Sequence, residues 1–364
     1  MRKHYLRFRE AETSYVMKCL KNSESCALVG VGSIGKSNLV HHLCDDDTLR
    51  HYLGDEQAAK TKVIVIDPYM MVAFDEAAPL SVRVWAGFEM LMHRLYIAFH
   101  PFDILGDDLD SFVNAYRALQ DGTNPLHAMM ALRYFERGIN LLLKHDVRVA
   151  FLFDEFEEVM FRMPPKFFQA LRGLRDMYKK SLSYLTFSRE PLNNIAQRVG
   201  YPMESIESFN ELFNDRILFV GPYTTIDAHA MVERLMQTEG KQLSGQTIDY
   251  LIQVSGGYAG LLRAAYRAIH DFGNVDPADL LGDALTHRLI NRLPIYNECA
   301  TIWKSLDVAE QEVLRMVLAG RSVREANYET QMAIAMLVRK GLLRPEGSLL
   351  RVNPPLLQLY LRGI

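Results

Sequence analysis

The stretch that decides the fold reads Gly30-Val31-Gly32-Ser33-Ile34-Gly35-Lys36-Ser37. It fits the phosphate-binding pattern in which a glycine is followed, after four residues, by Gly-Lys and a hydroxyl residue. In such a loop the glycines let backbone N–H groups turn toward a phosphate, the lysine reaches the β- and γ-phosphates, and the hydroxyl holds Mg²⁺. We therefore predict a nucleotide site here rather than an ordinary glycine-rich turn, with these roles for Lys36 and Ser37.

The residues on either side of the loop fit this prediction. Residues 25–29 predict a short buried strand that runs into the loop, and residues 37–43 predict a helix that leaves it. The positive N-terminal end of that helix adds to the attraction for phosphate. The residues of this stretch that we expect to bind the nucleotide are Gly30, Gly32, Ser33, Ile34, Gly35, Lys36, Ser37 and Asn38.

Composition sets limits on the class of protein. The chain has 364 residues, of which 49% are hydrophobic and 23% charged, so it can bury a large core and form more than one domain. The net charge of −3 gives no general sign of nucleic-acid binding. Four scattered cysteines lack the spacing of a zinc site or a disulfide framework. Residues 1–7 lack the apolar core of a signal peptide, and no apolar run could span a bilayer. We expect a soluble, cytoplasmic protein with no membrane partner.

Four further apolar segments predict strands that alternate with helices. They lie at residues 62–67, 147–153, 182–187 and 216–220. Continuous apolar runs are typical of strands covered on both faces in a parallel sheet. Helical spacing dominates residues 81–99, 110–144 and 165–180, and we interpret the apolar stripes of the first two as core faces. The pattern predicts a three-layer α/β sheet with a crevice at the strand ends.

The strand at residues 147–153 ends in an acidic pair, Asp154-Glu155. A carboxylate at a strand end beside a phosphate loop can hold Mg²⁺, and the next one can act as general base on an attacking water. An acidic pair after a strand is also a common turn. Together with the phosphate loop it predicts the second half of a site, in which Asp154 holds the metal and Glu155 activates water.

Cationic side chains provide further candidates. Arg189 follows the strand at 182–187, and we expect it to contact the γ-phosphate; the alternative is an ion pair with Glu190 or Glu155. Arg172 and Arg175 share a helix face, and either could act as an arginine finger from a neighbouring subunit. The chain supplies no arginine finger of its own, so we expect slow turnover from the isolated protein, because a finger contributes about 10³–10⁵ in rate.

After Pro222 the sequence becomes helical. Helices are predicted at residues 227–239, 247–254, 260–272 and 277–293, and they describe a small all-α domain. The turn at residues 255–260 leads into a helix that carries Arg263 and Arg267. One of these arginines could approach the phosphates, while at least one is expected to be plain surface.

The last part of the chain has the pattern of a winged helix-turn-helix. Helices are predicted at 309–319, 322–327 and 329–340, followed by a hairpin over residues 342–352. From residue 300 onward there are nine Lys/Arg against six Asp/Glu. The expected recognition helix, residues 330–338, is mostly apolar and offers few side chains that could read base edges. We therefore favour protein contact or intramolecular packing over sequence-specific DNA binding.

With these residues assembled, the chain resembles the STAND class of P-loop ATPases, close to the AAA+ group. Phe8-Arg9-Glu10 is similar to the box that these proteins carry beside the adenine. Residues 30–37 resemble their Walker A loop, residues 153–155 their Walker B motif, and residues 186–190 their strand ending in Ser-Arg. Gly221-Pro222 resembles their Gly-x-Pro region, and residues 255–258 resemble the Gly-Gly-aromatic turn of their lid.

The resemblance implies a P-loop ATPase domain at residues 1–220, a helical lid at 221–298 and a winged-helix domain at 299–364. It also implies ATP or ADP with Mg²⁺ as ligands, and it adds Arg9 and Pro222 to the nucleotide-binding residues. Of the two arginines after the turn at 255–260, we take Arg263 as the further nucleotide-binding candidate. The segment at residues 75–144 is longer than a minimal core of this class needs.

Three possible functions follow. The first is an ATP-hydrolysing switch whose nucleotide state positions the lid and the winged helix and controls assembly with a protein partner or with further copies. The alternative is a DNA-binding initiator or loader similar to archaeal origin-recognition proteins. A third possibility is a scaffold that binds nucleotide and barely hydrolyses it.

Overall fold

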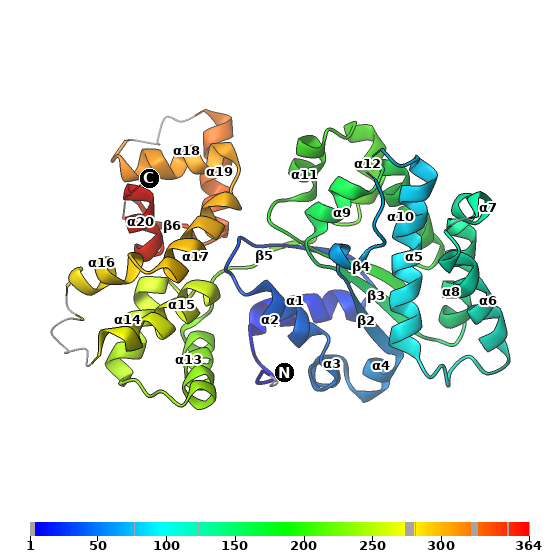
Figure 1. Cartoon of the computed structure of the whole chain (residues 1–364), viewed down its shortest axis with the longest axis horizontal. Coiled ribbons are helices and arrows are strands. Elements are labelled where there is room, and N and C mark those ends of the chain that lie inside the picture. The colour runs from blue at the N-terminus through cyan, green and yellow to red at the C-terminus, as the bar shows by residue number, and fades with distance from the viewer. Residues whose placement is uncertain are drawn as a thin grey trace. The chain divides into compact units, whose positions relative to one another are not determined.

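Figure 1 shows the computed structural model of the chain, which describes residues 4–75, 77–122, 124–273, 280, 282–321, 327–347 and 349–363. The chain divides into two compact units. Unit 1 comprises Met1–Val29 and Ser37–Leu218, and unit 2 comprises Gly30–Lys36 and Phe219–Ile364. Residues 30–36 of the phosphate loop therefore belong to unit 2, while Ser37 and the strand before the loop belong to unit 1.

A five-stranded sheet forms the centre of unit 1. In chain order its strands are β1 (Cys26–Val29), β2 (Thr61–Ile66), β3 (Arg148–Phe153), β4 (Leu182–Ser188) and β5 (Ile217–Phe219). Their order across the sheet is β2-β3-β4-β1-β5, and the pairs β2–β3, β3–β4 and β1–β4 are parallel. This confirms the expected α/β class with a parallel sheet, and each observed strand lies within one residue of its prediction.

The burial of the strands explains why their sequences are so uniformly apolar. Every residue of β1 and of β4 is buried, as is every residue of β3 after Arg148. These strands are central in the sheet and are covered on both faces. β5 lies at the edge and is partly exposed. Figure 1 shows α9, α10 and α12 on one side of the strands and α1 and α2 on the other.

The helices that surround this sheet are more numerous than the sequence predicted. They are α1 (Glu10–Lys21), α2 (Lys36–Leu43), α3 (Asp46–Leu53), α4 (Asp55–Lys60), α5 (Leu80–Phe99), α6 (Leu109–Gln120), α7 (Pro125–Met129), α8 (Ala131–Leu143), α9 (Phe156–Arg162), α10 (Pro165–Met177), α11 (Leu192–Val199) and α12 (Met203–Asn210), with short 3₁₀ turns at Pro68–Met70 and Gly106–Asp108. The helical pattern over residues 110–144 resolves into three helices. Gly122 lies in the first break, before Pro125 at the start of α7, and the second break is at Met130.

The apolar stripes of α5 and α8 form a core, as expected. Phe88 of α5 packs against Phe135 of α8 and Phe167 of α10, with ring centroids 5.3 and 5.2 Å apart. Phe135 in turn lies 6.2 Å from Phe151 of β3. The long segment at residues 75–144 thus provides helices that cover the sheet.

Unit 2 contains the remaining elements. They are α13 (Thr225–Glu239), α14 (Gly245–Ser255), α15 (Ala259–Ile269), a 3₁₀ turn at His270–Phe272, α16 (Ala284–Ile290), α17 (Leu293–Lys304), α18 (Val308–Leu318), α19 (Tyr328–Arg339), β6 (Leu343–Glu346), β7 (Leu349–Val352) and α20 (Pro355–Arg362). β6 and β7 pair antiparallel, as expected for the hairpin.

Two predictions for unit 2 need comment. The helix predicted at 277–293 is wrong at its end, because α16 stops at Ile290 and Pro294 starts α17, which then runs through residue 299, where the last domain was predicted to begin. The short helix predicted at 322–327 lies largely outside the described residues. The division of unit 2 into lid and winged helix therefore stays a prediction.

The turn at residues 255–258 joins α14 to α15 and contacts the C-terminal elements of unit 2. Gly256 and Gly257 have φ values of +60° and +80°, which favour glycine. A Cβ at Gly257 would lie 2.6 Å from the Tyr223 carbonyl oxygen, and one at Gly256 would lie 2.7 Å from Pro354. The buried Tyr258 hydroxyl donates to the Lys340 carbonyl at 3.0 Å. The glycines therefore allow a close approach that a side chain would block.

A buried ion pair joins α18 to the residue after α19. Lys340 Nζ lies 2.6 Å from Glu310 Oε1, and both side chains are 1% exposed. Burial raises the pKa of the Glu310 carboxyl, and the Lys340 ammonium opposes that rise. We expect Lys340→Met to lower the free energy of unfolding by about 3 kcal/mol, because it leaves the carboxylate buried without its counter-charge.

Chemical denaturation would measure this loss. The double variant Glu310→Gln/Lys340→Met removes both charges and is the matched control, and we expect it to recover most of the stability. A Lys340→Met protein as stable as the wild type would show that the pair contributes nothing.

Two global features complete the description. The four cysteines are free thiols, and three of them are buried. Within the part of the chain that the structure describes, every helix is too short or too polar to cross a membrane.

Candidate functional site

The strand that leads into the phosphate loop and the strand that carries the acidic pair end at the same edge of the sheet. β4 lies between them and is parallel to both. Val29, the last residue of β1, pairs with Ser188, and Phe153, the last residue of β3, pairs with Thr186. Because the strands run in the same direction, their carboxyl ends form one edge, which is where open α/β sheets bind ligands.

The acidic pair forms the turn between β3 and α9. The Glu155 amide donates to Asp154 Oδ1 at 2.9 Å, so the Asp154 carboxylate is held against the turn. Glu155 has a φ of +45°, a conformation that is uncommon for a residue with a side chain. Such outliers cluster at functional sites. The turn is therefore a candidate for the chemistry, and the roles of the two carboxylates stay predictions.

Arg189 makes the ion pair that the sequence analysis held as the alternative. Its Nη2 lies 2.8 Å from Glu155 Oε2, and its Nε lies 3.2 Å from Glu157 Oε1. Glu190, the other partner considered, pairs with Arg198 at 3.4 Å. Arg189 thus contacts the expected general base directly, and a contact with the γ-phosphate stays a prediction.

Phe8 and Arg9 are buried at the start of α1. The His4 ring stacks on Phe8 with centroids 3.9 Å apart, and His42 near the end of α2 meets Phe8 edge-on at 5.4 Å. Arg9 is 1% exposed and its Nη1 lies 2.7 Å from Glu12 Oε1. By themselves the residues Phe8-Arg9-Glu10 would indicate a surface salt-bridge cluster, but the burial of Arg9 shows that it does not belong to one. The box packs beside the helix that follows the phosphate loop.

The backbone of the phosphate loop adopts positive φ values at a glycine and at one residue with a side chain. Gly35 has a φ of +92° and Ser33 a φ of +62°, so a serine adopts a conformation that favours glycine. A Cβ at Gly35 would lie 2.9 Å from the Tyr223 hydroxyl. Ile34 is fully buried and Gly30 is buried, whereas Lys36 and Asn38 are partly exposed and Ser37 is exposed.

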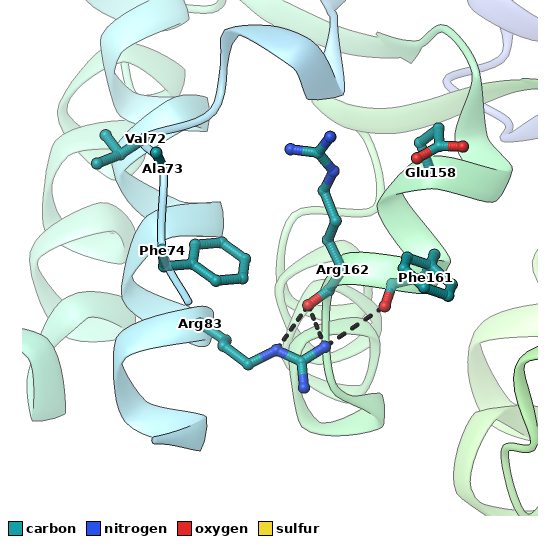
Figure 2. Close-up of a pocket in the computed structure, with 7 residues that line it drawn as sticks. All are labelled: Val72, Ala73, Phe74, Arg83, Glu158, Phe161 and Arg162. Carbon is teal, nitrogen blue, oxygen red and sulfur yellow. Dashed lines mark hydrogen bonds between the residues drawn. The ribbon is translucent and has the colours of Figure 1, made fainter. Parts of the chain in front are cut away.

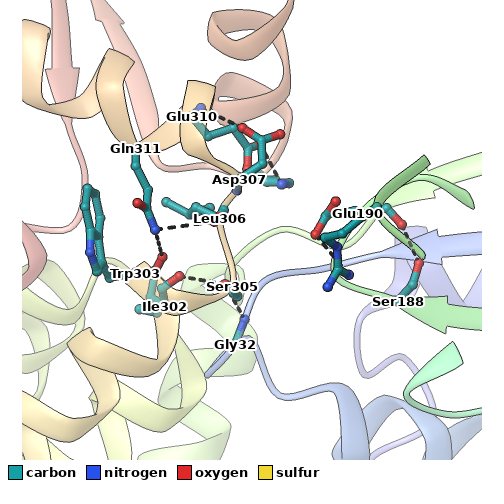
Figure 3. A network of polar contacts seen from close by, with 12 residues as sticks. Gly32, Ser188, Glu190, Ile302, Trp303, Ser305, Leu306, Asp307, Glu310 and Gln311 are labelled. Atoms are coloured by element: carbon teal, nitrogen blue, oxygen red, sulfur yellow. Dashed lines mark hydrogen bonds and ion pairs between the residues drawn. The ribbon is translucent and has the colours of Figure 1, made fainter. Parts of the chain in front are cut away.

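Within unit 2 the loop contacts helices α15 and α17. The Gly260 amide donates to the Ser33 carbonyl at 2.9 Å, and the Gly32 amide donates to Ser305 Oγ at 3.1 Å. The Ser33 hydroxyl donates to the Glu298 carboxylate. Figure 3 shows Gly32 beside Ser305.

Sequence reasoning missed four residues at the loop. They are Tyr223, Glu298, Thr301 and Ser305. Tyr223 directly follows Gly221-Pro222, so the motif pointed to its neighbourhood. The other three lie more than 260 positions from the loop in sequence, in a helix with no recognised motif. Only the tertiary structure could reveal them.

The remaining nucleotide-binding candidates lie in unit 2. Pro222 packs in the turn region described above, where a Cβ at Gly341 would lie 2.8 Å from its ring. Arg263 is exposed in the first turns of α15. Arg267 lies one turn further, is exposed as well, and forms an ion pair with Glu239 at 3.0 Å, so both arginines lie on the surface and a contact of Arg263 with nucleotide stays a prediction.

The two finger candidates have structural partners in this chain. Arg175 Nη2 donates to the Ser23 carbonyl at 2.7 Å, and burial lowers the pKa of the Arg175 guanidinium. Arg172 Nε pairs with Asp176 at 2.8 Å. Both arginines therefore stabilise unit 1, and a role in a neighbouring site stays a prediction.

The donor set suits a magnesium ion shared with phosphate better than a metal held by protein alone. Among the described residues there is no group of three or more His, Cys, Asp or Glu side chains that could hold a metal. Ser37 and Asp154 offer hydroxyl and carboxylate oxygens, the ligands that Mg²⁺ prefers, and Mg²⁺ commonly uses one or two protein ligands plus phosphate oxygens. The predicted pair therefore fits this ion.

A separate cavity of about 490 Å³ lies beside α9 (Figure 2). Arg83 of α5 reaches the last turn of α9, where its Nε donates to the Arg162 carbonyl at 2.7 Å. A cation at the carboxyl end of a helix satisfies otherwise unpaired carbonyl groups. Phe74 and Phe161 also line the cavity. Arg83 thus has a structural role, and the cavity contains none of the predicted nucleotide-binding residues.

Comparison with known proteins gives a fold and no closer relationship. No protein-family model and no curated protein matches the sequence. A Walker-type ATPase of Pyrococcus abyssi has a similar structure, with a TM-score of 0.54 and 15% identity, over 97% of this chain and 95% of that one. This chain has the fold of a Walker-type P-loop ATPase.

Two other solved structures are similar over nearly the full length. The Cdc6 protein of Pyrobaculum aerophilum has a TM-score of 0.43 and 10% identity, over 98% of this chain and 93% of that one. The ORC1 protein of Aeropyrum pernix, solved in complex with DNA, has a TM-score of 0.42 and 11% identity, over 98% and 92%. Both of these scores lie below 0.5, and the Pyrococcus structure, at 15% identity, shows a shared fold alone.

Proposed function

We propose that this chain is an ATP-binding molecular switch of the STAND type, which hydrolyses ATP slowly and whose nucleotide state controls the lid, the winged helix and assembly with partners. The observation that carries the proposal is the shared edge formed by the ends of β1, β3 and β4. It gathers the strand before the phosphate loop, the acidic turn and Arg189, which are the parts that phosphoryl transfer needs.

Each residue has a defined task in this proposal. Lys36 and the loop amides bind the β- and γ-phosphates, and Ser37 and Asp154 hold Mg²⁺, which neutralises phosphate charge when bound. Glu155 takes a proton from the attacking water. Because Arg189 pairs with Glu155, it fixes the position of that carboxylate before water is activated. Arg9, Pro222 and Arg263 complete the nucleotide site.

The resemblance favours adenine over guanine, and the sequence has no guanine-specific Asn-Lys-x-Asp motif.

The segment expected to be a winged helix favours a protein partner. Its helix α19 exposes Tyr328 and Met332, which are 77% and 47% exposed and lie one turn apart. Apolar side chains on the expected recognition helix suit protein contact better than base edges.

One observation favours the DNA-binding alternative. Arg344 and Arg351 face each other across the β6–β7 hairpin, and both are exposed, although Arg351 also pairs with Glu346 at 3.2 Å. Two exposed arginines on paired strands of a hairpin could contact a phosphate backbone. DNA binding that falls steeply between roughly 50 and 200 mM salt would support this alternative.

The size of the protein in solution tests the switch. We expect its hydrodynamic size to differ between ADP and a non-hydrolysable ATP analogue, because the γ-phosphate distinguishes the two states. Light scattering coupled to size-exclusion chromatography, with and without duplex DNA, would measure it. Identical profiles in all nucleotides would contradict the switch, and a complex formed only with DNA would favour the loader.

A further inference from the structure

Helix α17 and the residue after its end cover the phosphate loop in unit 2. Ser305 Oγ accepts the Gly32 amide at 3.1 Å and itself donates to the Ile302 carbonyl at 2.6 Å (Figure 3). A Cβ at Gly32 would lie 2.7 Å from Thr301 Cγ2. The loop is therefore packed against α17 closely enough that only glycine fits at this position.

A carboxylate completes the contact. Glu298 accepts the Ser33 hydroxyl, and a Cβ at Gly260 would collide with the same carboxylate and with that hydroxyl. Gly260 is the second residue of α15, so Glu298 lies near the positive end of a helix as well as on the loop. The negative side chain therefore sits where the protein offers donors to an anion.

These contacts compete with a nucleotide for the same groups. A phosphate-binding loop presents its backbone N–H groups to phosphate oxygens, and here one of them already donates to Ser305. Phosphate charges would be repelled by a carboxylate at the loop, since like charges in partly desolvated surroundings interact strongly. The contact of Glu298 with this loop therefore disfavours triphosphate binding, and triphosphate binding disfavours that contact.

We propose that α17 is a latch on the phosphate loop, formed by Glu298, Thr301 and Ser305, which holds the nucleotide-free loop and must be displaced when ATP binds. This inference rests on the proposed function, and it identifies how that site is regulated. The latched and released states would differ in their affinity for ATP, and this difference would bias the chain toward its nucleotide-free form.

The latch is connected to the C-terminal elements of unit 2. Gln311 of α18 donates to the Trp303 carbonyl at 3.0 Å. Tyr296 of α17 and Tyr360 of α20 meet edge-on with ring centroids 4.9 Å apart. Displacement of α17 would therefore move or break contacts with α18 and α20. Nucleotide binding is thereby coupled to the part of the chain predicted to engage partners.

Binding of MgATP to latch variants tests the proposal. We expect Glu298→Gln and Ser305→Ala to bind a fluorescent ATP analogue about tenfold more tightly than the wild type, because the competing charge or acceptor is gone. Glu312→Gln is the matched control, since Glu312 is exposed on α18 and pairs only with Arg315 at 3.8 Å among the described residues. Its affinity should equal that of the wild type.

Hydrogen exchange of the nucleotide-free protein provides a second measurement. We expect the Gly32 amide to exchange more rapidly in Ser305→Ala, because its acceptor is lost, and to be unaffected in Glu312→Gln. If all variants bind ATP with equal affinity and exchange at equal rates, the latch is wrong while the nucleotide site stands. If neither the wild type nor any variant binds ATP, the proposed function and the latch both fail.

Discussion

Replacing Lys36 by alanine is expected to weaken ATP binding at least about a hundredfold, because charge-assisted hydrogen bonds to phosphate contribute roughly 1.5–3 kcal/mol and the charge itself adds to this. Lys36 is the first residue of α2 and directly follows Gly35, whose φ of +92° bends the loop. Its ammonium is the one formal positive charge in residues 30–37. Titration with a fluorescent ATP analogue would measure the loss.

Lys60→Ala is the matched control for this experiment. Lys60 is a partly exposed lysine that pairs with Glu56 and Asp146, and it has no place in the phosphate loop. We expect it to leave the affinity unchanged. If Lys36→Ala binds ATP as tightly as the wild type, the loop does not bind phosphate and the proposed function has no basis.

Replacing Glu155 by glutamine is expected to lower ATP turnover by about 10²–10³ while nucleotide affinity stays within a few fold of the wild type. A general base contributes roughly 10²–10⁴ in rate, and an amide cannot accept the proton from water. Glutamine has nearly the same shape as glutamate, so the strained turn at the end of β3 should persist. Release of inorganic phosphate under single-turnover conditions would measure the chemical step.

Two further variants separate catalysis from the ion pair around Glu155. Glu158→Gln is the control, because Glu158 lies in the same short helix and faces the separate cavity beside α9. Arg189→Ala removes the partner of Glu155, and we expect an intermediate loss of turnover. If Glu155→Gln turns over ATP as rapidly as the wild type, Glu155 is not the base, and a scaffold that binds without hydrolysis becomes the better description.

Much of the fold followed from local patterns in the sequence. Each strand of the five-stranded sheet is a largely apolar run whose length and flanking residues mark it, and the loop at 30–37 has a spacing that few other structures require. Because these patterns are local, they did not show where the predicted helices are interrupted. The pattern at 110–144 has helical spacing throughout, yet Gly122 and Pro125 divide it, and the break between α16 and α17 depends on the position of Pro294.

For the candidate site, too, the sequence predicted the residues that belong to local motifs and did not predict the contacts between distant ones. Lys36, Asp154 and Glu155 could be chosen from sequence because each lies within a few residues of an apolar strand. The burial of Arg9 and the pairing of Arg189 with Glu155 could not, because they depend on residues brought together by packing. Arg189 illustrates the point, since the sequence offered Glu155 and Glu190 as partners, whereas the structure pairs Arg189 with Glu155 and Glu157.

By itself, the sequence determined that the chain contains a phosphate loop between a strand and a helix, and that a carboxylate pair ends a second strand. Only the tertiary structure decided that β4 lies between those strands, so that their ends share one edge. It also decided that Glu298 and Ser305 contact the loop from more than 260 residues away. The reason is physical: short-range steric and hydrophobic preferences act along the chain, whereas strand order and loop contacts depend on how the whole core packs.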